Sequence, residues 1–96
     1  MKLNILGGIY TVRTQLEPII YNESECDGTC DYDTMTIDIV LADDPQETES
    51  SLVHEMIHAM AEEGGLNKAL SADVMEIICE QVSSVITKNF RLILRD

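Results

Sequence analysis

Residues 54–58 read His-Glu-Met-Ile-His and contain both histidines of the 96-residue chain. Residues four apart on a helix lie on one face, about one turn apart, so two imidazoles at this spacing can reach a single metal ion. Zinc takes nitrogen ligands at about 2.0–2.1 Å, and catalytic zinc sites use three protein ligands and a water. Glu55 lies at the rim of the same face, where it can take a proton from metal-bound water. The pattern predicts one Zn²⁺ per chain, held by His54 and His58, with Glu55 as general base.

The third metal ligand must be a carboxylate or a thiolate, because no further histidine is present. Glu76 and Glu80 are four residues apart on a predicted helix, off its apolar stripe and on one shared face. If the two helices pack side by side, one Glu completes the metal site and the other holds the free N–H of a histidine. The alternative interpretation is a solvated acidic helix face. The residues alone do not decide between Glu76 and Glu80.

The order of these residues resembles that of the gluzincin group of metallopeptidases. His54-Glu55-Met56-Ile57-His58 is followed, after 17 residues, by Glu76-Ile77-Ile78-Cys79-Glu80. The chain also resembles small prokaryotic and phage zincins, including those related to the repressor-cleaving ImmA/IrrE-like family. The resemblance covers about residues 34–90 and implies that Glu76 is the third ligand and Glu80 the acid that supports a histidine. Glu stands at position 80 where Asp is more usual in that group.

The resemblance further implies a peptidase in which zinc-activated water hydrolyses a peptide bond. In such enzymes the strand before the metal-binding helix lies along the cleft and pairs with an extended peptide. By position this is an edge strand at about residues 34–41, with Thr36, Ile37 and Asp38 as the substrate-binding residues. The acidic flanks of this strand are equally consistent with protection of an exposed edge against aggregation.

A peptidase usually needs a second donor beside the metal to stabilise the oxyanion. Neither motif supplies one, and the remaining candidates are Tyr10, Tyr21 and Tyr32. Tyr32 is preferred because it directly precedes the predicted cleft strand, although a half-buried loop tyrosine is the simpler interpretation.

The elements that must position these residues predict an α+β fold. Leu3–Leu6 and Ile9–Thr14 are β-prone runs around Gly7-Gly8, which indicates a hairpin over about residues 3–14 in a small antiparallel sheet. Residues 22–33 are polar and aperiodic, as in a loop, and residues 34–41 alternate as in a half-buried strand. Asp44-Pro45 and Gly64-Gly65 bound a helix over about residues 46–63. A second helix is predicted over about residues 71–90. Its apolar stripe consists of Val74, Ile77, Ile78, Val82, Val85 and Ile86. For the tail at residues 90–96 the sequence is consistent both with a continued helix and with an extended chain.

Length and charge limit the classes of function. The chain is predicted to form one zincin-like domain over residues 1–96. A formal net charge of −12 disfavours nucleic acids and anionic membranes as partners and favours a peptide or protein substrate that is neutral or basic. The sequence shows no signal-peptide pattern and no apolar run of about 20 residues. Its cysteines are odd in number (Cys26, Cys30 and Cys79). These features favour a cytoplasmic protein with free thiols.

Two rival functions remain open from the sequence. In the first, the metal-binding scaffold is a metal-stabilised binding or regulatory module without efficient turnover, which the small size and the missing oxyanion donor favour. In the second, the chain is an acidic decoy that mimics nucleic acid and occupies a basic protein, which the net charge of −12 permits.

Overall fold

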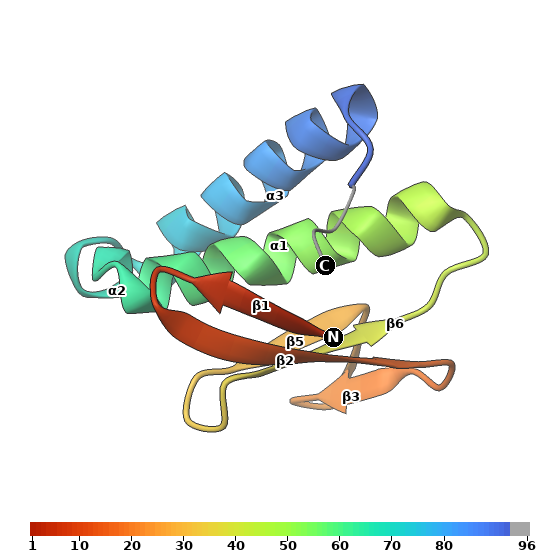
Figure 1. Ribbon diagram of the computed structural model, residues 1–96, viewed down its shortest axis with the longest axis horizontal. Coiled ribbons are helices and arrows are strands. Elements are labelled where there is room, and N and C mark those ends of the chain that lie inside the picture. The colour runs from red at the N-terminus through yellow and green to blue at the C-terminus, as the bar shows by residue number, and fades with distance from the viewer. Residues whose placement is uncertain (93–96) are drawn as a thin grey trace.

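A computed structural model describes residues 1–92 and shows an α+β fold, which confirms the predicted class. Three layers are stacked in the order sheet, α1, α3, with α1 in the middle (Figure 1). The strands are β1 (Lys2–Ile5), β2 (Gly8–Gln15), β3 (Ile19–Tyr21), β4 (Ser24–Cys26), β5 (Gly28–Asp31) and β6 (Thr36–Val40). The helices are α1 (Pro45–Glu63), α2 (Leu66–Ala69) and α3 (Ala72–Asn89). No helix within residues 1–92 is both long and apolar enough to cross a membrane.

The main sheet has four strands in the order β1-β2-β6-β5 and is mixed rather than antiparallel. β1 and β2 form the predicted hairpin, but its turn is Leu6-Gly7, with φ of 50° and 91°, and not Gly7-Gly8, because Gly8 already pairs with Ile5. Two residues with positive φ make the tight turn that matches the twist of the flanking strands. β2 pairs in parallel with β6, with Val12 opposite Ile37, and β6 pairs antiparallel with β5. The expectation of a purely antiparallel sheet was wrong because β6 joins the hairpin after a long excursion of the chain.

The prediction that residues 34–41 form an edge strand was also wrong. β6 has a neighbour on each side, and the edge is formed by β5, which lies in the segment expected to be a loop. The same segment contains β4, which pairs with β3 just before it, and the turn residues Asn22 and Glu23 of this hairpin have φ of 50° and 66°. These strands have only three or four residues, which is too short for the alternation from which a strand is recognised, and the side chains of β4 and β5 are mostly polar.

α1 begins and ends where the sequence predicts. The side chain of Asp44 accepts a hydrogen bond from the backbone N–H of Gln46, Pro45 is the first helical residue, and Gly65 follows the end with φ of 85°. One side of α1 packs on the sheet and the other on α3. The core between α1 and the sheet is formed by Ile5, Tyr10, Val12, Ile37, Ile39, Leu52 and Ala59. A helix covered on both sides in this way is a rigid platform for the side chains it presents.

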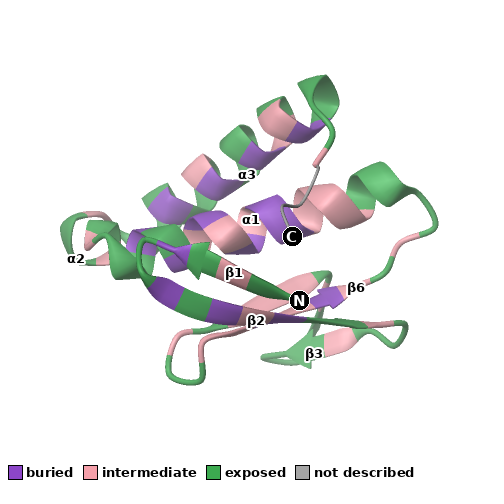
Figure 2. Cartoon of the chain, viewed as in Figure 1, coloured by how far each residue is buried: buried purple, intermediate pink, exposed green. Residues whose placement is uncertain are grey.

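α3 packs on α1 chiefly through a row of mostly small residues, and of its predicted apolar stripe Ile78 and Ile86 also pack against this core. The buried residues are Met75, Cys79, Ser83 and Thr87, each four apart (Figure 2). The hydroxyl of Thr87 donates to the carbonyl of Ser83 at 2.8 Å, and that of Ser83 donates to the carbonyl of Glu80 at 3.2 Å. Because both hydroxyls are satisfied within the helix, they can be buried at little cost and allow close approach of the two backbones.

The predicted helix over residues 71–90 is confirmed, with Ser71 as its N-cap. Its side chain accepts from the backbone N–H of Val74 at 3.2 Å. The helix ends at Asn89, and Phe90 is extended with φ of −135° and ψ of 155°. Of the tail at residues 90–96, whose conformation the sequence did not decide, the start is therefore extended. Residues 93–96 lie outside the described part of the chain.

Candidate metal centre

α1 holds the two histidines side by side on the flank that faces α3. Their side chains are 13% and 19% exposed, and their ring centroids are 4.9 Å apart. The Nε2 atoms of His54 and His58 lie 3.2 Å apart, so both rings direct the same nitrogen to one point. With suitable tautomers this is one hydrogen bond between neutral imidazoles, whereas a cation held there would be bound by both lone pairs.

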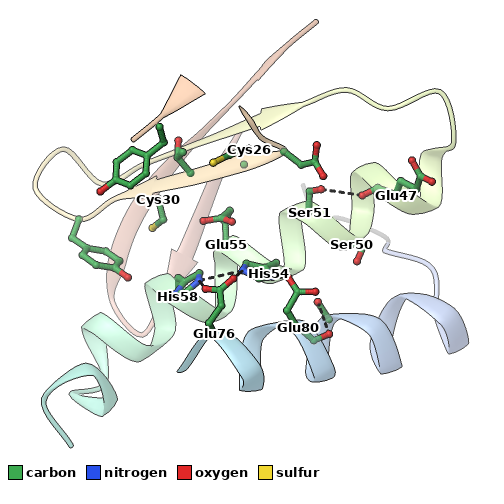
Figure 3. Close-up of a pocket in the computed structure, with 16 residues that line it drawn as sticks. Cys26, Cys30, Glu47, Ser50, Ser51, His54, Glu55, His58, Glu76 and Glu80 are labelled. Atoms are coloured by element: carbon green, nitrogen blue, oxygen red, sulfur yellow. Dashed lines mark hydrogen bonds and ion pairs between the residues drawn. The ribbon is translucent and has the colours of Figure 1, made fainter. Parts of the chain in front are cut away.

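Glu76 of α3 completes this convergence from across the interface. Its Oε1 lies 3.1 Å from Nε2 of His54, and its Oε2 lies 3.0 Å from Nε2 of His58 (Figure 3). Two imidazole nitrogens and one carboxylate therefore meet at one point, and they belong to His54, His58 and Glu76, the three residues that the resemblance implies as ligands. The donor set fits zinc, which binds imidazole and carboxylate ligands and leaves a fourth position open in catalytic sites.

Glu80 takes a different position, one turn further along α3. Its Oε1 lies 3.0 Å from Nδ1 of His54, the ring nitrogen that faces away from the convergence point. A carboxylate on the second nitrogen fixes the tautomer and the orientation of a metal-binding imidazole and raises its basicity. The arrangement matches the supporting position predicted for Glu80 and leaves Glu76 as the carboxylate between the two histidines.

Cys79 adds a sulfur donor to the buried side of the same site. His54, His58 and Cys79 form a group that could hold a metal ion, with one donor atom from each residue within 4.8 Å of the others. The thiol is fully buried. Burial, with the charges of Glu76, Glu55 and Glu80, raises the pKa of the Cys79 thiol to about 11. His54, Glu76 and Glu80 form a second such group, and the members of both groups come from α1 and α3.

Glu55 lies next to His54 but points toward the sheet side of the cleft (Figure 3). Only 8% of the residue is exposed, and burial, followed by the charges of Glu76 and Glu80, raises its pKa to about 7. A divalent cation nearby would oppose this shift by favouring the charged carboxylate. Burial and the neighbouring His54 lower the pKa of His58, which favours the neutral imidazole that metal ions require.

Gly28 makes room for Glu55 at the start of β5. A Cβ atom at this position would lie 3.0 Å from Cγ of Glu55, 3.0 Å from Cδ1 of Ile39 and 3.3 Å from the carbonyl oxygen of Asp38. Any larger residue would displace the Glu55 side chain or the strand. The role of Gly28 was not predicted, because it depends on the approach of α1 to a strand that the sequence did not reveal.

A cleft of about 770 Å³ opens beside these residues. One wall consists of β5 and the hairpin β3–β4, and the other consists of α1 and α3 (Figure 3). The lining residues are Tyr21, Cys26, Asp27, Gly28, Thr29, Cys30, Tyr32, Glu47, Ser50, Ser51, His54, Glu55, His58, Glu76, Glu80 and Ser83. None of these residues is Lys or Arg, so the described cleft wall is acidic.

The structure does not place Thr36, Ile37 and Asp38 on the cleft. Ile37 is fully buried in the core, and the carboxylate of Asp38 binds the guanidinium of Arg13 at 2.7 Å. Since β6 is paired on both sides, its backbone is not free for a peptide, and this part of the prediction was wrong. The free backbone edge beside the cleft belongs to β5.

The three tyrosines considered as oxyanion donors have different environments. Tyr10 is fully buried and donates its hydroxyl to Oε1 of Glu63 at 3.0 Å, so it is engaged away from the site. Tyr32 and Tyr21 both line the cleft. Burial raises the pKa of Tyr32, which keeps its hydroxyl protonated and able to donate. Tyr32 therefore remains the predicted donor, with Tyr21 as a second cleft tyrosine.

No protein-family model, curated protein sequence or solved structure matches this chain. The interpretation of the centre therefore depends on its own geometry and chemistry.

Proposed function

We propose that the protein is a zinc-dependent peptidase in which His54, His58 and Glu76 hold the cation. The observation that carries the proposal is the convergence of both Nε2 atoms and both Glu76 oxygens within 3.0–3.2 Å, with Glu80 on the opposite nitrogen of His54. A dication held there supplies the positive charge that acidifies a water molecule and polarises a substrate carbonyl.

The residues around this centre support hydrolysis of an extended peptide. The unpaired edge of β5 offers backbone N–H and C=O groups along the cleft, so a peptide can add as a further strand beside Thr29. Glu55, buried next to His54, accepts a proton from the attacking water and transfers it to the departing amine nitrogen. The C–O bond forms, the C–N bond breaks, and one carboxyl and one amino terminus result.

The test is peptide hydrolysis by wild type and by Glu55→Gln, with zinc content measured on both. Glu55→Gln is expected to keep its zinc and to lose at least about 100-fold in kcat/KM on a mixed peptide library. Glu62→Gln is the matched control, because Glu62 is an exposed glutamate on the same helix and is outside the cleft lining. Equal hydrolysis by Glu55→Gln and wild type would exclude Glu55 as the base.

A metal-stabilised binding module is the second candidate function, and the position of Cys79 favours it. A thiolate added to two imidazoles and a carboxylate fills four positions, as in structural zinc sites, and leaves no place for water. Wild-type protein with one zinc per chain and no hydrolysis of any library peptide would support this candidate over the peptidase. Loss of the zinc in Cys79→Ser would support it further, because the peptidase site does not need this thiol.

A further inference from the structure

The outer side of α3 carries an apolar surface that nothing in the described chain covers. Val74, Ile77, Val82 and Val85 are 42%, 56%, 39% and 61% exposed, and we refer to these four residues as the α3 ridge. At 100° per residue Val74, Ile77 and Val85 lie on the side of the helix away from the buried row that contacts α1, and Val82 lies at the border between the two sides. Figure 2 shows the same division, with the side of α3 next to α1 buried and its outer side exposed. Several large apolar side chains grouped on one exposed face typically mark a binding surface.

The ridge is symmetric about the middle of α3, between Cys79 and Glu80. If two copies of α3 pack antiparallel around a twofold axis at this point, Val74 of one copy lies opposite Val85 of the other. Ile77 and Val82 lie about 140° apart around the helix and therefore on the two flanks of the contact, not opposite each other. The Val74–Val85 contact is apolar and the twofold axis generates it twice, as an interface between identical patches requires.

The charges at the two ends of the helix fit the same arrangement. Asp73 is the acidic residue of the first turn and Lys88 the basic residue of the last turn. In the antiparallel pair, Asp73 of one copy comes within about 3 Å, measured along the helix axis, of Lys88 of the other. The twofold axis generates this ion pair twice, at the two ends of the interface. A parallel pair would instead place like charges together.

We propose that the protein forms a homodimer through antiparallel packing of the α3 ridges. This goes beyond the proposed function, because the ridge lies away from the α1 flank that carries His54 and His58. The contact involves one helix of about 27 Å from each copy, which belongs among the smaller interfaces. Because each copy carries a net charge of −12, the dimer is expected to become tighter as salt screens the repulsion between copies.

Sedimentation equilibrium of the full chain over about 1 µM to 1 mM tests the proposal. Wild type is expected to be dimeric at the upper end of this range, and Val85→Asp is expected to raise the dissociation constant by at least about 100-fold. Ile20→Asp is the control, because Ile20 is also 64% exposed but lies on β3, and this variant should associate like wild type. Circular dichroism and the melting temperature establish that each variant is folded.

Charge variants test the antiparallel register. Asp73→Lys and Lys88→Asp alone are each expected to weaken self-association beyond the effect of their net charge, whereas a mixture of the two forms heterodimers with opposite charges at both contacts. The double variant keeps the net charge of −12 and should dimerise like wild type. A monomeric wild type at all concentrations and salt levels would overturn the proposal, as would a dimer that Val85→Asp leaves unchanged.

Discussion

Replacement of Glu80 by Ala tests the division of labour between the two glutamates of α3. Oε1 of Glu80 lies 3.0 Å from Nδ1 of His54, so the variant removes the group that orients this ring but none of the atoms at the convergence point. Loss of such a supporting partner typically lowers metal affinity 10- to 100-fold. Because the side chain of Glu80 is 69% exposed, water can replace its oxygen, and we expect the lower end of this range, about 10-fold.

Glu76→Ala should behave differently. It removes both oxygens that lie 3.1 and 3.0 Å from the Nε2 atoms of the two histidines, and with them the third ligand. Stoichiometric zinc binding at neutral pH should then be lost. Competition with a chromophoric chelator measures the zinc affinity of both variants under identical conditions. Asp73→Asn, which removes one negative charge from the first turn of the same helix, controls for the change in net charge.

Two results would refute the reasoning. A Glu80→Ala variant that loses more affinity than Glu76→Ala would make Glu80 the ligand. Equal losses in Glu80→Ala and Asp73→Asn would show that the effect is one of net charge and not of ring orientation.

Three further predictions concern the base, alkaline pH and metal removal. Gly28→Ala should reduce peptide hydrolysis by about 10- to 100-fold at unchanged zinc content, because the new methyl group would lie 3.0 Å from Cγ of Glu55; unchanged kinetics would show that the side chain yields. The urea midpoint of the metal-free protein should fall between about pH 9 and about pH 12, because burial raises the pKa of the Cys30 thiol from 9.0 to about 12 and that of Tyr10 above its ordinary 10.0. Both groups stay protonated in the fold while the unfolded chain loses these protons, so the stabilisation is complete below about pH 9 and is lost as the pH rises; a constant midpoint would contradict it. Chelation should lower the melting temperature by about 11–22 °C, because zinc at 100 times its dissociation constant adds about 2.7 kcal/mol; identical melting with and without chelator would mean that no metal stabilises the fold.

The helix that carries His54 and His58 was predictable because its information is local. The start of the helix is marked by Asp44-Pro45 and its end by Gly64-Gly65. The spacing of four between the two histidines places both on one face of this helix. The prediction for Glu76 and Glu80 required one further assumption, because these residues reach the site only if α3 packs beside α1. The observed contacts of these two glutamates with the histidines agree with the positions predicted for them.

The cleft wall was not predictable to the same degree. β5 has four residues and polar flanks, and its place at the sheet edge depends on pairing with β6 across an intervening turn. Without β5, the strand at residues 36–40 seemed to be the open edge, and Gly28 had no evident role. Strand order is set by non-local pairing, which a single sequence does not display.

The orientation of α3 shows a second limit. An apolar stripe at helical spacing typically faces a core, yet α3 uses a row that includes Cys79, Ser83 and Thr87 against α1. Small residues with internally satisfied hydroxyls allow close helix packing, and this leaves the α3 ridge exposed. The pattern predicts that a helix forms, whereas shape complementarity with the neighbouring helix decides which side is buried.

The central claim is that this chain holds one catalytic zinc between α1 and α3. Elemental analysis of protein purified without chelators, with wild type and Glu76→Ala compared side by side, tests it most directly. The account predicts one zinc per wild-type chain and a substoichiometric amount in the variant. Wild-type protein without stoichiometric metal, or a variant that retains its full zinc, would contradict the site as described.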